Sequence, residues 1–155
     1  MKQKLVAMIT ALILFTSTNA ADPVGPNLTP RLKGLLADEM QQVAAATSDL
    51  ALAITTGDHA TVHRLSNAVR DSFILKQSLT EQDKKDLMSA VPPEFVALDR
   101  HFHGLAGKLA NEAEKKNSEL QNFYFSRMLE TCTTCHARFA ADRFPGLTEP
   151  GPGEH

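Results

Sequence analysis

The chain is poor in cysteine and in the larger aromatic residues: its 155 residues include two cysteines, one tyrosine and no tryptophan. Two cysteines can form one disulfide at most, so several bridges cannot hold this fold together. A zinc site needs four ligands, and no second Cys/His pair lies at a suitable spacing. The two cysteines therefore require another explanation.

Long apolar runs are lacking except at the amino terminus. An apolar stretch of 11 residues starts at Leu5, follows Lys2 and Lys4, and leads to small residues that end at Ala20. Such a stretch is too short to span the ~30 Å hydrocarbon core of a bilayer. The pattern is typical of a secretory signal peptide. We therefore predict a signal peptide over residues 1–20, export to the periplasm, and no membrane span after cleavage.

A large excess of charge of one sign is also absent. The formal net charge is −2, and cleavage after Ala20 would remove two lysines and no acidic residue, which gives −4. Domains that bind nucleic acid are usually basic, so no nucleic acid is expected as a partner. No nucleophile–base arrangement is recognisable, and the sequence does not predict an enzyme.

Apolar residues recur at three- and four-residue steps, which is typical of amphipathic helices, and no alternating strand pattern occurs. Thr29 followed by Pro30 predicts a helix start, and Gly57 predicts a stop before a helix capped by Asp58. The expected helices are residues 30–55, residues 59–77, a short capped helix from Thr80 to Pro92-Pro93, a helix from about Glu94, and a helix capped by Ser118. We predict an all-α fold, an antiparallel four-helix bundle over residues 21–144, with a flexible tail at 145–155.

The most specific motif is Cys132-Thr133-Thr134-Cys135-His136 on the last expected helix. Residues at i, i+3 and i+4 of a helix share one face, so the two thiols and the imidazole point the same way. The motif is typical of c-type haem attachment, which takes place outside the bacterial cytoplasm. We predict one haem c, bound covalently at Cys132 and Cys135, with His136 as the proximal iron ligand. A redox-active thiol pair is the alternative interpretation.

The sixth iron ligand has two candidates. Met40 lies on the predicted apolar stripe of helix 30–55, and a Met/His ligand pair is common in electron transfer. His103 follows Asp99 by four residues, so a hydrogen bond between these two side chains is the competing role for His103. Met128 is on the same helix as His136 and is discounted.

Three aromatic residues are expected to pack on the haem. Phe139 lies one turn beyond Cys135, Phe102 lies on the facing helix, and Tyr124 shares a helix face with Cys132. Ordinary core packing is the alternative for all three.

The chain from about Leu28 to Phe144 resembles the class II c-type cytochromes, the cytochrome c′ family. The resemblance depends on a haem motif near the carboxyl terminus, on Phe139 three residues after His136, and on the helix corner at residues 54–58. It implies a four-helix bundle, often a homodimer. The sequence departs from the family at Ala140, where a basic residue is usual.

The resemblance implies two alternative functions. Members with a methionine from the first helix on the iron transfer electrons, and Met40 lies near that position. Members with a five-coordinate iron bind NO or CO. We expect a one-electron carrier that exchanges electrons with periplasmic redox proteins, and a five-coordinate gas-binding protein is the alternative.

Overall fold

The computed structural model describes residues 22–147, and this part of the chain is all-α, with no strand. The predicted signal peptide and the end of the predicted tail lie outside the described residues. The helices are α1 (Pro30–Thr56), α2 (His59–Asp71), α3 (Leu75–Ser78), α4 (Glu81–Ala90), α5 (Pro93–Glu114) and α6 (Ser118–Phe139), with 3-10 turns η1 (Gly25–Asn27) and η2 (Pro145–Leu147). Within residues 22–147, no helix is both long enough and apolar enough to cross a membrane.

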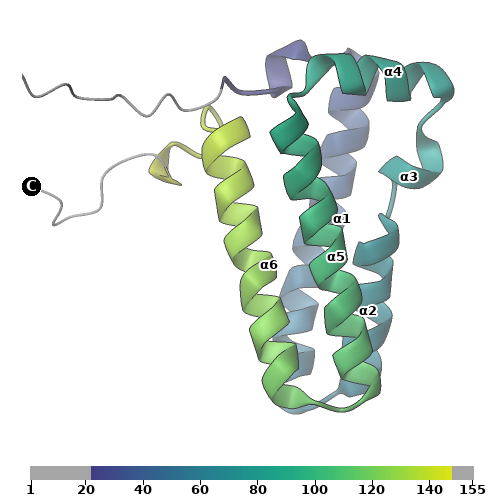
Figure 1. The fold of residues 1–155 in the computed structure, drawn as a ribbon, viewed down its shortest axis with the longest axis vertical. Coiled ribbons are helices and arrows are strands. Elements are labelled where there is room, and N and C mark those ends of the chain that lie inside the picture. The colour runs from purple at the N-terminus through teal and green to yellow at the C-terminus, as the bar shows by residue number, and fades with distance from the viewer. Residues whose placement is uncertain (1–21, 148–155) are drawn as a thin grey trace, which may run out of the picture.

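The six α-helices pack together into one body. Helices α1, α2, α5 and α6 run side by side along the long axis, and α3 and α4 connect α2 to α5 at the end where α1 begins (Figure 1). The closest packing is α2 against α5 and α5 against α6, followed by α1 against α2.

Local capping explains most helix boundaries. The Thr29 side chain accepts a hydrogen bond from the Leu32 N–H at 3.2 Å, and Pro30 starts α1. Gly57 ends α1 with φ 73°, a left-handed conformation that suits glycine. Asp58 then accepts from the Thr61 N–H at 3.0 Å and starts α2. All of these predicted boundaries are confirmed.

The predicted cap of α4 is confirmed, and the predicted cap of α6 is wrong by one residue. Thr80 and Asp83 form a capping box at the start of α4, as the sequence predicts. The cap of α6 is Asn117, not Ser118: the Asn117 side chain accepts from the Leu120 N–H at 3.1 Å. Asparagine is as good a cap as serine, so the choice depends on where the preceding turn ends.

The predicted helix over residues 59–77 is wrong in its last part, where a break separates α2 from α3. Helix α2 stops at Asp71, and Ser72 adopts φ 61°. The next three backbone N–H groups, of residues 73–75, donate to the Glu39 carboxylate at 3.1, 2.6 and 3.2 Å instead of to carbonyls one turn earlier. Glu39 is 1% exposed, and its three hydrogen bonds join the first half of α1 to the α2–α3 connection.

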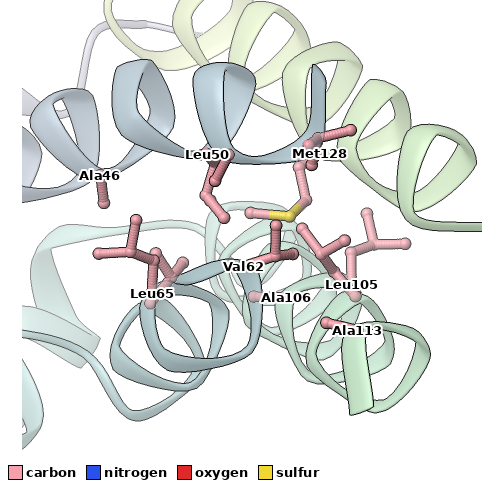
Figure 2. Packing of buried hydrophobic residues seen from close by; sticks show 12 residues of the cluster. Ala46, Leu50, Val62, Leu65, Leu105, Ala106, Ala113 and Met128 are labelled. Atoms are coloured by element: carbon pink, nitrogen blue, oxygen red, sulfur yellow. The ribbon is translucent and has the colours of Figure 1, made fainter. Parts of the chain in front are cut away.

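The apolar core has two parts. The central cluster lies between α1, α2, α5 and α6, and Figure 2 shows Met128 of α6 reaching in beside Leu50 and Val62. The terminal cluster lies at the end where the described chain begins. Its buried members are Val24, Leu28, Leu32, Val91 and Phe139, and partly buried side chains including Leu36, Phe95, Leu98 and Cys135 pack on it.

The segment before α1 belongs to the terminal cluster. Val24 and Leu28 are each 5% exposed, and the Val24 N–H donates to the Phe139 carbonyl at 2.9 Å. The first residues of the described chain therefore hold the carboxyl end of α6.

Candidate functional site

The candidate site lies on the last three turns of α6. Cys132, Cys135 and His136 occupy i, i+3 and i+4 positions of this helix, so they share one side of it, as predicted. Both cysteines are free thiols and are partly buried. Cys135 packs on the terminal cluster, which places this part of the motif against an apolar surface.

The environment of the two thiols opposes thiolate formation. Burial raises the pKa of the Cys132 thiol, and burial, with the added repulsion of Asp99, raises the pKa of Cys135 to about 11. A redox-active thiol pair needs a lowered pKa, which helix amino termini supply, but this motif lies toward the carboxyl end of its helix. The site thus disfavours disulfide exchange, whereas an uncharged thioether suits the partly buried position.

Within residues 22–147, neither nitrogen of the His136 imidazole makes a hydrogen bond. Burial, and then the positive charge of Arg143, lower the pKa of His136. The ring is therefore neutral near pH 7, which is the form that binds a metal. The Phe144 ring stacks on the imidazole, with the two ring centroids 4.1 Å apart and the planes at 8°.

The terminal cluster brings Phe139 together with Cys135, as the sequence predicts. Phe139 is 1% exposed and meets the Phe95 ring edge-on at 5.6 Å. Phe102 and Tyr124 pack on the central cluster instead, so the structure does not group them with Cys135.

A cavity of about 460 Å³ opens beside this end of α6. Leu28 and Leu36 line it and belong to the same terminal cluster as Cys135. Lys33, Arg143 and the acidic Asp142 also line it, whereas Cys132, Cys135 and His136 do not.

Met40 does not lie on the buried stripe of α1. Its side chain is 38% exposed, and the neighbouring Glu39 takes the buried position. The prediction that Met40 belongs to the apolar stripe is therefore wrong by one step of about 100° around the helix. One turn earlier, Leu36 is the α1 residue that is partly buried in the terminal cluster with Cys135.

His103 is held on both sides of its ring. Nδ1 donates to the Val69 carbonyl at 2.6 Å, and Nε2 lies 3.4 Å from the Asp99 carboxylate. The predicted Asp99–His103 pair is confirmed, and neither nitrogen is open to iron in this arrangement. Met128 is 2% exposed in the central cluster, which agrees with discounting it as a ligand.

The Asp99–His103 pair makes stability depend on pH. Burial alone would lower the pKa of His103, but Asp99 and the Val69 carbonyl outweigh it and the pKa is raised. The protonated ring therefore stabilises the folded state fully below the unfolded-state pKa of about 6.5, and this contribution is lost as pH rises through the higher folded-state pKa. In Asp99→Asn we expect a lower His103 pKa by NMR titration. The stability difference from the native protein should be present near pH 6 and disappear at alkaline pH. An unchanged His103 titration would contradict this.

Some site residues were not predicted from the sequence. Leu36 is one of many apolar residues on its helix and nothing in the sequence singles it out, and Phe144 lies beyond the last helix, where helical periodicity gives no information. Lys33 and Arg143 are 110 positions apart, and only the fold shows that they share a cavity.

Comparison of the chain with protein-family models, with curated proteins and with solved structures found no match. The function must therefore be argued from the residues of the site.

Proposed function

We propose that this protein is a periplasmic c-type cytochrome that holds one haem c and transfers single electrons. One observation carries the proposal: two free thiols and an imidazole that makes no hydrogen bond within residues 22–147 lie on one side of α6, and Cys135 packs on an apolar cluster. Few arrangements other than haem attachment use all three residues.

Each residue of the site would have a distinct role in holding the haem. Bound haem supplies an iron that alternates between Fe(III) and Fe(II). Cys132 and Cys135 would hold it through thioethers, and His136 would bind its iron. Leu36 and Phe139 would keep water from the ring, and Lys33 and Arg143 would offset the charge of its carboxylates.

The same proposal includes the bundle topology, the signal peptide and the periplasmic location. Helices α1, α2, α5 and α6 would form the antiparallel four-helix bundle of the class II cytochromes c, with residues 1–20 as a signal peptide. The partners would then be periplasmic redox proteins, and a homodimer is consistent with the family resemblance.

A five-coordinate protein that binds NO or CO is the second candidate. The presence of Leu36 beside Cys135 in the terminal cluster favours it, because an apolar side chain there would leave the sixth iron position open. Met40, which is 38% exposed on the next turn of α1, supports the electron carrier if it turns inward to the iron.

Two measurements on protein isolated from a bacterial periplasm test these proposals. The intact mass should exceed that of the mature polypeptide by one haem, and a mass equal to the polypeptide alone would end both. The optical spectrum of the reduced protein then separates them. Sharp low-spin bands that CO leaves unchanged support the electron carrier, and a broad high-spin spectrum that shifts with CO supports the gas-binding protein.

Replacement of Met40 by alanine tests the distal ligand. If Met40 binds iron, Met40→Ala should convert the reduced spectrum from low-spin to high-spin and make it respond to CO. Met88→Ala is the matched control, because Met88 is 60% exposed on α4 and belongs to neither apolar cluster. A low-spin spectrum that survives in Met40→Ala removes Met40 from the iron.

A further inference from the structure

The chain beyond α6 turns back over the attachment site. Helix α6 ends at Phe139, and the Ala140 carbonyl accepts from the Arg143 N–H at 2.9 Å and from the Phe144 N–H at 3.1 Å. The Leu147 N–H donates to the Phe144 carbonyl at 3.1 Å, which closes η2. Backbone hydrogen bonds on both sides of Phe144 therefore hold the turn from which its ring projects.

The Phe144 ring lies flat on the His136 imidazole, with 4.1 Å between centroids and 8° between planes. This contact covers one face of the imidazole and leaves the ring edge, which carries both nitrogens, uncovered. A metal binds an imidazole in the plane of the ring, through a nitrogen lone pair. The stack therefore leaves the direction of a metal bond free while it restricts rotation of the ring.

Metal-binding histidines usually have their ring plane fixed by a hydrogen bond from the second nitrogen to a carboxylate or carbonyl. Within residues 22–147, His136 makes no such hydrogen bond. His103 shows what that arrangement looks like elsewhere in this protein, since its Nδ1 donates to the Val69 carbonyl at 2.6 Å. The only ring contact that orients His136 in the described part of the chain is Phe144.

We propose that Phe144 is a positioning residue for the proximal ligand: its stacked ring sets the plane of the His136 imidazole in place of a hydrogen bond. The inference depends on the proposed haem, and it concerns a residue outside the attachment motif. Phe144 is 38% exposed and lies outside the long helices, so its replacement removes the stack with little effect on the core. A stacked aromatic pair contributes enough to favour one ring orientation by about two- to tenfold.

The test uses the haem-loaded protein and the proton NMR signals of the four haem methyl groups in the Fe(III) state. Their order and spread depend on the plane of the axial imidazole. Phe144→Leu should change both, because the ring can then adopt other orientations. Phe144→Tyr keeps a stacked ring and should preserve the native pattern.

Phe123→Leu is the matched control, because Phe123 is a 52% exposed phenylalanine of α6 whose ring contacts Tyr124 and not the site. A native pattern in Phe144→Leu would overturn the proposal, and so would an equal change in Phe123→Leu. If Phe144→Leu folds poorly, Phe144→Tyr still decides, since a changed pattern there contradicts a role for the stacked ring. Absence of haem from every variant and from the native protein would instead refute the proposed function.

Discussion

Replacement of both Cys132 and Cys135 by alanine is expected to abolish covalent haem, so that the intact mass of the periplasmic protein falls to that of the polypeptide. The two thiols are the only cysteines of the chain, so no other residue can form a thioether. Each single replacement should leave one thioether and a lower yield of haem-bound chain. The measurement is intact mass, with haem-dependent peroxidase staining after denaturing electrophoresis.

The control for this experiment is Thr133→Ala with Thr134→Ala. Both threonines lie between the cysteines and are exposed, and their hydroxyls donate to the Glu130 carbonyl of the preceding turn, at 2.9 and 2.8 Å. Their replacement should leave one haem per chain. Retention of covalent haem in the double cysteine variant would remove the basis of the proposed function.

The largest loss of stability is expected from Glu39→Ala. The carboxylate accepts three backbone N–H groups of residues 73–75, and alanine would leave these donors without their partner. Each unsatisfied buried donor costs roughly 1–3 kcal/mol, and because these donors are only partly buried we expect a total of about 3 kcal/mol. The measurement is urea unfolding followed by circular dichroism, with a lower midpoint and an unchanged slope.

Asp38→Ala controls for the loss of a negative charge from α1. Asp38 is the preceding residue and is exposed, so its replacement should change the free energy of unfolding by less than about 0.5 kcal/mol. Glu39→Gln should be intermediate, because an amide oxygen can still accept while the amide nitrogen cannot. Equal stabilities of Glu39→Ala and Asp38→Ala would show that the three hydrogen bonds contribute little.

Helix boundaries could be predicted because the signals for them are local. Thr29 with Pro30, Gly57 with Asp58, and Thr80 with Asp83 each satisfy backbone groups within one turn, so a few residues determine each outcome. The arrangement of Cys132, Cys135 and His136 is local in the same sense, because their spacing places them on one helix face whatever surrounds the helix.

The features that could not be predicted depend on residues far apart in the sequence. Helix α2 ends early because Glu39, 34 positions before Phe73, supplies an acceptor there. The same buried carboxylate turns Met40 toward the surface, and periodicity alone gave no reason to place an acidic residue inside and a methionine outside. The contact of Phe144 with His136 depends on a turn whose residues have no helical pattern.

Because the Val24 N–H donates to the Phe139 carbonyl, the last turn of α6 depends on the opposite end of the described chain to stay ordered. The carboxyl end of a helix frays easily, and here the residue that holds it in place lies more than a hundred positions earlier in the sequence. Truncation of the chain past Val24, or a bulky fusion placed just ahead of Val24, would therefore loosen the final turn of α6 without changing any residue of the motif.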